Sequence, residues 1–282
     1  MSILVDKNTQ VLIQGITGNE GSRACREMLS YGTKVIAGVT PGRAGQKIAG
    51  VPVYDTVREA LRRHSSINTS LISVPAPFVR DAAGEAILAG IPLINILAEH
   101  VPTQDSAFII ALAKYKGVRV VGPSSVGIIS PGKAKVGSIG SSTIARLFQP
   151  GPVGLISKSG GMTAEIASVL TRAGLGQSTA IGIGGDQIIG SDFVDLLKLF
   201  AVDNNTKAVV IFGEVGGTYE ENAAKFIQNG GFRKPVVAVV AGKFTTTLPK
   251  ETILGHAGAI VSQGRGGYHS KVGAFKRAGV IL

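Results

Sequence analysis

The sequence alternates short apolar runs with segments of helical spacing almost from end to end, and this alternation most constrains its fold. It predicts parallel, doubly wound α/β sheets that bind ligands at the carboxyl ends of their strands. Glycines and prolines interrupt the pattern between residues 122 and 152, where we expect a domain boundary. A chain of 282 residues is long enough for two domains that each bury a core.

Composition excludes several classes of protein. The apolar runs are short and punctuated by glycine, so we expect no membrane span, and the first residues lack a secretory pattern, which predicts a cytoplasmic protein. The single cysteine, Cys25, excludes an internal disulfide and a cysteine-based metal site, and we predict no metal site in this chain. The net charge of +11 comes from scattered lysines and arginines with few aromatic residues, so anionic small molecules or an acidic partner explain it better than nucleic acid does.

A glycine turn at residues 15–21 lies between the predicted strand 11–14 and a predicted helix over residues 22–31. Strand, turn and helix start form a cradle for phosphate, because the first amides of a helix are free and positively polarised. The next strand, residues 34–39, is not followed by the acidic residue that an NAD site requires. Arg43 stands there between glycines, which favours NADP or the 3′-phosphorylated ADP of coenzyme A; the alternative is a solvated arginine in a turn.

The second half contains a candidate phosphoryl carrier. His256 lies among small residues in the stretch 254–260, where an anion could approach the imidazole; the alternative is a loop histidine that only satisfies a hydrogen bond. Glu214 ends a predicted strand between glycines and could accept the Nδ1 proton. Ser159 and Gly160 begin a predicted helix and could present a hydroxyl and an amide to phosphoryl oxygens. The chain has no G-x-x-x-x-G-K-[ST] motif, so we expect a partner subunit to bind the nucleotide.

Six motifs, taken in order, resemble the alpha subunit of succinyl-CoA synthetase within the NDP-forming acyl-CoA ligase superfamily. The resemblance covers nearly the whole chain. The motifs are Gly15-Ile16-Thr17-Gly18, Val39-Thr40-Pro41-Gly42-Arg43, Val74-Pro75-Ala76-Pro77, Gly182-Ile183-Gly184-Gly185-Asp186, Gly213-Glu214-Val215-Gly216-Gly217 and Gly255-His256-Ala257-Gly258-Ala259-Ile260.

The resemblance implies a Rossmann-like CoA-binding domain over residues 1–125, a linker over 126–150 and a flavodoxin-like ligase domain over 151–282 that carries the phosphohistidine loop. It further implies that His256 is phosphorylated and hydrogen-bonded by Glu214, and that the helix beginning at Ser159 and Gly160 is one of two that embrace the phosphate. The residues that fall where the family holds CoA are Thr17, Gly18, Asn19, Glu20, Arg43, Leu97, Ala98 and Glu99.

The family's beta subunit supplies an ATP-grasp domain, ATP or GTP, Mg²⁺ and the second phosphate-binding helix, so the resemblance implies an αβ or α2β2 assembly. The expected reaction joins a small carboxylic acid to CoA with cleavage of NTP to NDP and phosphate, through a phosphohistidine. Succinate is the first acid expected. The alternatives are a citrate- or malate-type ligase subunit, a CoA-binding sensor without catalysis and, as a third, an NADP oxidoreductase.

Two departures from the family bear on the acid. Ala164 stands where succinate enzymes usually carry tyrosine, and Ser124-Ser125-Val126 replaces an asparagine-cysteine-proline run. Both neighbourhoods resemble ATP-citrate lyase and citryl-CoA synthetase. Arg43 also replaces the commoner lysine, which keeps the charge but changes the donor geometry.

Overall fold

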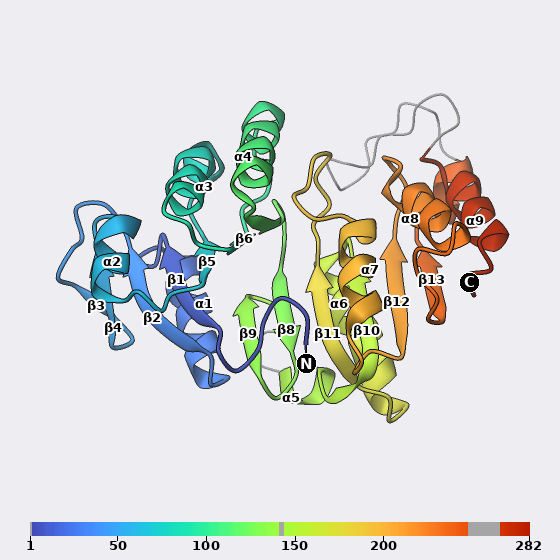
Figure 1. The fold of residues 1–282 in the computed structure, drawn as a ribbon, viewed down its shortest axis with the longest axis horizontal. Coiled ribbons are helices and arrows are strands. Elements are labelled where there is room, and N and C mark those ends of the chain that lie inside the picture. Colours follow the sequence, from blue (N-terminus) through green and yellow to red (C-terminus); the bar gives the residue numbers. More distant parts are fainter. Residues whose placement is uncertain (1, 141–143, 248–265) are drawn as a thin grey trace.

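The computed structural model describes residues 2–140, 144–247 and 266–282, and it consists of two α/β halves side by side (Figure 1). Each half is built on a mostly parallel sheet with helices packed on it, which confirms the predicted fold class. In this part of the chain no helix has the length and apolar character needed to cross a bilayer.

The first sheet has the strand order β3-β4-β2-β1-β5-β6-β7. All neighbouring pairs are parallel except β3 with β4, so only the short edge strand β3 runs against the rest. Without β3, the order is that of a Rossmann sheet, in which the chain reverses its direction of winding at the first strand. The strands are β1 (Gln10–Gln14), β2 (Lys34–Val39), β3 (Lys47–Ile48), β4 (Val51–Tyr54), β5 (Thr69–Ile72), β6 (Leu93–Ile96) and β7 (Arg119–Val121).

Two close approaches explain the glycine turn after β1. Gly15 has φ +81°, and a Cβ there would lie 2.5 Å from the carbonyl oxygen of Ser73. A Cβ on Gly21 would collide with the carbonyl oxygen of Gly15. The turn therefore packs the start of α1 against the end of β1, as a phosphate-binding turn does. The helices of this half are α1 (Asn19–Ser30), α2 (Val57–Arg63), the short 3-10 helix η1 (Ala76–Phe78), α3 (Val79–Leu88) and α4 (Thr103–Lys116).

The second sheet has the order β13-β12-β10-β11-β8-β9. Its parallel strands β10 to β13 follow the flavodoxin order, with β10 next to both β11 and β12. The strands are β8 (Gly127–Ser130), β9 (Ala134–Gly137), β10 (Pro150–Ser157), β11 (Gln177–Gly182), β12 (Ala208–Gly213) and β13 (Val236–Val240). The helices are α5 (Ile144–Leu147), α6 (Gly160–Arg172), α7 (Phe193–Val202), α8 (Tyr219–Gln228), the 3-10 helix η3 (Lys243–Thr247) and α9 (Tyr268–Arg277).

The segment predicted as a linker, residues 126–150, contains ordered sheet. Strands β8 and β9 form a hairpin whose first strand pairs antiparallel with β11. Both strands are buried along their whole length, because they lie between the parallel strands of the second half and helix α1 of the first. The alternation of strands and helices that guides a sequence-based reading is absent here, since a hairpin needs no crossover helix.

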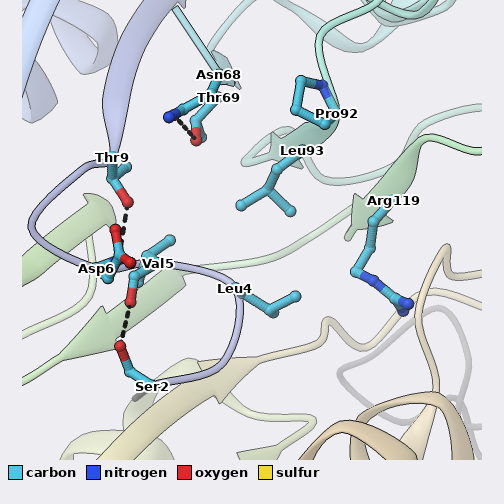
Figure 2. A pocket seen from close by; sticks show the side chains of 10 residues that line it. All are labelled: Ser2, Leu4, Val5, Asp6, Thr9, Asn68, Thr69, Pro92, Leu93 and Arg119. Carbon is cyan, nitrogen blue, oxygen red and sulfur yellow. Dashed lines mark hydrogen bonds between the residues drawn. The ribbon is translucent and has the colours of Figure 1, made fainter.

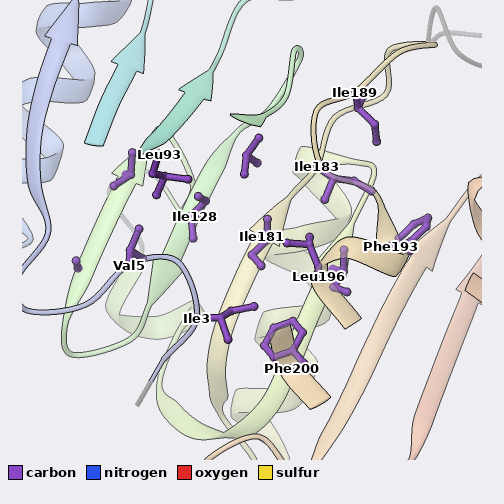
Figure 3. Packing of buried hydrophobic residues seen from close by; sticks show 14 of the residues in the cluster. Ile3, Val5, Leu93, Ile128, Ile181, Ile183, Ile189, Phe193, Leu196 and Phe200 are labelled. Carbon is purple, nitrogen blue, oxygen red and sulfur yellow. The ribbon is translucent and has the colours of Figure 1, made fainter. Parts of the chain in front are cut away.

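One hydrophobic cluster runs through both halves of the molecule. Figure 3 shows Ile3 and Val5 of the N-terminal segment in the same cluster as Leu93 of the first sheet and side chains of β11 and α7, including Ile181 and Phe200. All of these side chains are buried. Because apolar burial is the main stabilising term in folding, a continuous cluster holds the two sheets in one arrangement.

A buried ion pair also joins the halves. Lys135 on β9 is 1% exposed, and its Nζ lies 2.9 Å from Glu27 Oε2 on α1. Thr33 donates its hydroxyl to the carbonyl oxygen of Lys135 and accepts the amide of the same residue, each at 2.9 Å. Burial lowers the pKa of Lys135 from 10.5, and the hydrogen bond and charge of Glu27 oppose that shift.

We expect Glu27→Gln to lower the free energy of unfolding by about 2–3 kcal/mol, because it leaves the Lys135 ammonium buried without a counter-charge. Because Glu27 opposes the effect of burial, its removal lowers the folded-state pKa of Lys135 further below 10.5. The variant then gains more stability than the unaltered protein as its buried lysine loses its proton, so the deficit in stability should narrow as the pH rises toward 10.5. Urea unfolding at two pH values measures both effects. The double variant Glu27→Gln/Lys135→Met should recover part of the loss; a double variant as unstable as the sum of the single ones would contradict this account.

Candidate functional site

A cavity of about 560 Å³ opens at the carboxyl ends of β1, β5 and β6. This is the switch point of the first sheet, where β1 lies between β2 and β5, and where open α/β sheets bind their ligands. Its lining residues come from three strand ends and from the junction between the halves: Gly18, Asn19, Glu20, Ser73, Val74, Pro75, Ala76, Leu97, Ala98, Glu99, Ser124, Ser125, Val126 and Ser138.

Helix α1 begins at one wall of this cavity. Gly18 is its N-cap and makes no side-chain capping bond, so the first amides of the helix are free to bind an anion. Thr17, just before the cavity wall, donates its hydroxyl to Thr40 Oγ1 at 3.2 Å and thereby joins the loops that follow β1 and β2. The opposite wall is largely apolar and suits the uncharged part of a long ligand.

Of the eight residues predicted to hold CoA, six line the cavity. Thr17 lies next to it. Arg43 does not line it: this residue lies in an exposed turn after β2, where its backbone amide donates to Asp55 Oδ1 at 3.1 Å. The prediction did not include the wall formed by residues 124–126 and 138. These come from the segment between the sheets, and only the fold brings them to β1.

Ser125 forms the floor of the cavity and links the two sheets. Its hydroxyl donates to the carbonyl oxygen of Gly182 on β11 at 2.6 Å, and it accepts from Asn95 Nδ2 on β6 at 2.7 Å and from the Gly127 amide at 3.0 Å. Asn95 is fully buried, and its Nδ2 also donates to the carbonyl oxygen of Val121 at 3.3 Å. The Ser125 hydroxyl therefore satisfies two donors, one from each half, and one acceptor on β11.

The second half carries its candidate groups at the carboxyl ends of β10 and β12. These strands pair in parallel up to Ser157 and Phe212, so Ser159 and Glu214 each lie two residues beyond a matched pair. Ser159 is the N-cap of α6, and its hydroxyl accepts the amide of Met162 at 3.4 Å. The amino end of a thirteen-residue helix and the loop that carries Glu214 therefore lie at the same edge of the sheet.

Glu214 belongs to a cluster of buried charges that the sequence analysis did not foresee. Lys158 Nζ lies 3.8 Å from Glu214 Oε1 and 3.7 Å from Glu220 Oε1, and Glu220 Oε1 accepts the backbone amide of Glu214 at 3.0 Å. On the other side of Glu220, Lys271 pairs with Glu220 Oε2 and, at 3.2 Å, with Glu221 Oε2. Lys158, Glu220 and Lys271 are almost completely buried. A signal was available: Lys158 is a charged residue at the end of an apolar strand.

His256 lies outside the described residues, but the structure gives contacts for residues before and after its segment. After β13, Ala241 donates its amide to the carbonyl oxygen of Gly213 at 2.9 Å. Gly266 accepts the amide of Gly216 at 2.8 Å and donates its own to Glu221 Oε1 at 3.1 Å. Ala241, which precedes this segment, and Gly266, which follows it, are thus each hydrogen-bonded to the loop that follows β12 or to the last residue of that strand.

Another cavity lies at the opposite edge of the first sheet. Figure 2 shows it lined by the N-terminal segment around Asp6 and by the first residues of β5, β6 and β7, with Arg119 at its far side. Its volume is about 350 Å³. Because it opens at the amino ends of the strands, it is not where this fold class binds its principal ligand.

Comparison with known proteins agrees with this geometry. Residues 6–100 match the CoA binding domain family and residues 156–281 match the CoA-ligase family. The chain is 49% identical over 279 residues to the succinate–CoA ligase [ADP-forming] subunit alpha 2 of Archaeoglobus fulgidus, which covers 99% of this chain and 94% of that protein. It is 45% identical to the corresponding alpha subunit of Methanothermobacter thermautotrophicus, covering 99% and 92%.

The chain belongs to the succinate–CoA ligase alpha-subunit family. This confirms the resemblance inferred from the six sequence motifs. Among solved structures, the ATP citrate lyase of Methanothrix soehngenii in complex with citrate and coenzyme A matches with a TM-score of 0.92 at 27% identity. The match covers 99% of this chain and 48% of that protein, so the chain spans about half of that longer relative.

We expect Ser125→Ala to lower the free energy of unfolding by about 1–3 kcal/mol, since it leaves the Asn95 amide and the Gly182 carbonyl without their shared partner in a buried site. Ser138→Ala is the matched control. That serine lies in the same cavity but makes one weaker hydrogen bond, 3.3 Å to the carbonyl oxygen of Val126, so we expect a loss within about 0.5 kcal/mol. Thermal and urea unfolding measure both variants, and equal losses would contradict the special role of Ser125.

Proposed function

We propose that this chain is the subunit of an acid–CoA ligase that binds CoA at the carboxyl edge of its first sheet and carries a phosphoryl group on His256. The observation that carries the proposal is the family membership over 99% of the chain, together with a cavity at the switch point of the CoA-binding half. In the proposed reaction an acid, CoA and NTP give acyl-CoA, NDP and phosphate.

The cavity that begins at Gly18 suits CoA for two reasons. The free amides at the start of α1 can bind phosphate oxygens, and the apolar wall formed by residues 74–76, 97–98 and 126 can contact the uncharged arm that ends in the thiol. The citrate lyase relative was solved with coenzyme A bound. We propose Gly18, Asn19, Glu20, Leu97, Ala98 and Glu99 as contacts, with Thr17 bracing the loop. Arg43 would reach the ligand from its exposed turn.

The proposed phosphoryl transfer passes through a covalent intermediate on His256. His256 Nε2 attacks the γ-phosphorus of NTP; an N–P bond forms, the P–O bond to NDP breaks, and Glu214 accepts the hydrogen bond of the Nδ1 proton. A carboxylate oxygen of the acid then takes the phosphoryl group and frees the imidazole. The CoA thiolate attacks the acyl phosphate, and phosphate leaves. Ser159 and Gly160, at the amino end of α6, stabilise the phosphoryl oxygens in this scheme.

The proposed reaction also needs a partner subunit that binds the nucleotide. The relatives are named as alpha subunits, and the sequence contains no nucleotide-binding motif of the P-loop type. We propose that a beta subunit binds ATP or GTP with Mg²⁺ through an ATP-grasp domain, in an αβ or α2β2 assembly. The cytoplasmic location stays a prediction from the sequence.

Succinate is the proposed acid because the two similar alpha subunits described above belong, by name, to succinate–CoA ligases. Citrate is the second candidate. Ala164 lies near the start of α6, where succinate enzymes usually carry tyrosine, and the structure of a citrate lyase superposes on the whole chain. A panel of succinate, citrate, malate and acetate offered to the complex with its beta subunit distinguishes these acids by hydroxamate formation.

We expect His256→Asn to abolish acid-labile ³²P incorporation from [γ-³²P]ATP into this chain in the complex with its beta subunit, because asparagine has no nucleophilic nitrogen of this kind. His269→Asn, a change on helix α9, serves as the control and should keep the label. Label that persists in the His256 variant would remove this residue from the mechanism. A protein that binds CoA but never forms a phosphoenzyme or a hydroxamate would be the sensor instead.

We expect Ala98→Trp to weaken CoA binding by at least about 100-fold, since the indole fills a cavity that the ligand needs. Ala111→Trp, on the exposed side of helix α4 in the same half, should leave the affinity unchanged. Isothermal titration of CoA into both variants measures the effect. Unchanged CoA affinity in the Ala98 variant would place CoA elsewhere.

A further inference from the structure

The charge cluster beneath Glu214 contains a lysine whose position is not explained by structural need alone. Lys158 follows the last residue of β10 and precedes the N-cap Ser159. Its backbone amide donates to the carbonyl oxygen of Phe212 on β12 at 3.2 Å, which fixes the main chain between the two strand ends. The side chain is 2% exposed, so its charge is held inside the protein beside two carboxylates.

Glu220 does not need Lys158 as its counter-ion. Lys271 already pairs with Glu220 Oε2 at the shortest distance in the cluster, and it also donates to the carbonyl oxygen of Gly217 at 3.0 Å. The contact from Lys158 to Glu220 Oε1 is longer, at 3.7 Å. A buried carboxylate needs one well-placed positive partner, and Glu220 has that partner on its other side.

The second carboxylate near Lys158 is the one at the proposed reaction centre. Glu214 Oε1 lies 3.8 Å from the ammonium, and its side chain is 13% exposed, whereas Glu220 is fully buried. The backbone amide of Glu214 donates to the same oxygen, Glu220 Oε1, that Lys158 faces. Glu220 therefore binds the backbone amide of Glu214, and Lys158 lies against the Glu214 carboxylate.

Among the described residues, the cluster holds more carboxylates than ammonium groups. Three carboxylates, from Glu214, Glu220 and Glu221, face two ammonium groups, from Lys158 and Lys271. Lys158 lies within 4 Å of both Glu214 and Glu220, so its removal would leave the repulsion between these two carboxylates less compensated. Like charges repel more strongly in a medium of low dielectric constant than in water, so loss of the ammonium favours displacement of the more exposed carboxylate, that of Glu214.

We propose that Lys158 is a positioning residue for phosphoryl transfer: its buried ammonium holds the Glu214 carboxylate at the end of β12, where it can orient a histidine. This inference rests on the proposed function and deepens it. Lys158 need not touch the substrate or the phosphoryl group. It acts through Glu214, and its effect depends on charge and on reach into the cluster.

The experiment compares Lys158→Met, which removes the charge and keeps the stem, with Lys158→Arg, which keeps the charge. The complex with the beta subunit is mixed with [γ-³²P]ATP, and acid-labile label on this chain is followed by rapid quench. We expect Lys158→Met to slow labelling by about 100-fold, as misplacement of a catalytic group by an ångström does. Lys158→Arg should stay within about 10-fold of the unaltered complex. CoA affinity should not change in either variant.

A double-mutant cycle shows whether the lysine acts through Glu214. In a Glu214→Gln background, Lys158→Met should slow labelling by less than about 3-fold more, because the group it positions is already lost. A purely structural lysine would instead give losses that multiply. Losses that multiply, or a Lys158→Met complex that is labelled at the unaltered rate, would overturn the inference.

Lys234→Met is the matched control. Lys234 lies two residues before β13 and donates to the carbonyl oxygens of Phe200 and Asp203 at 2.6 and 2.7 Å. We expect it to lower the melting temperature and to leave the labelling rate within about 2-fold. If Lys158→Met does not assemble, Lys158→Gln takes its place in the same cycle. An unaltered complex that acquires no label overturns the proposed function and this inference together, whereas normal labelling of the lysine variants overturns the inference alone.

Discussion

The parallel pairing of β10 with β12 is the constraint on which the second half depends. Parallel strands must end at the same edge of a sheet, so pairing Ser157 with Phe212 brings the residues that follow each strand together. Helix α6 then starts beside the loop of Glu214, and the buried lysine lies between the two strand ends. The same rule, applied to β1, β5 and β6, produces the cavity of the first half.

Much of this fold follows from local sequence pattern. The glycine turn at residues 15–21 is predictable because only glycine tolerates the close backbone approach between Gly15 and Ser73. The apolar runs are predictable as parallel strands because such strands are buried on both faces of the sheet. The cavity wall at Leu97 and Ala98 follows from the same logic, since any strand end in such a sheet faces the ligand edge. The identity of the ligands follows only from the resemblance to a family, because local hydrophobic pattern does not specify which molecule binds.

Other features depend on contacts between distant segments, which local pattern does not encode. The hairpin β8–β9 looked like a loop because its strands are four residues long and have no crossover helix. Lys135 and Lys271 would be placed on the surface by their chemistry alone, yet each is buried by partners far away in the chain, Glu27 and Glu220. Nothing in the local sequence around Ser125 predicts that its hydroxyl forms hydrogen bonds with both β6 and β11.

The position of Ser125 has a thermodynamic consequence. Ser125 lines the cavity, and its hydroxyl also joins β6 of the first sheet to β11 of the second. A ligand that contacts this residue therefore depends on the packing of both halves. A molecule that binds only when the two sheets are packed together stabilises that packing, by an amount that grows with its concentration relative to its dissociation constant. A ligand in this cavity would therefore favour the arrangement of both halves that the shared hydrophobic cluster and the Lys135–Glu27 ion pair also hold.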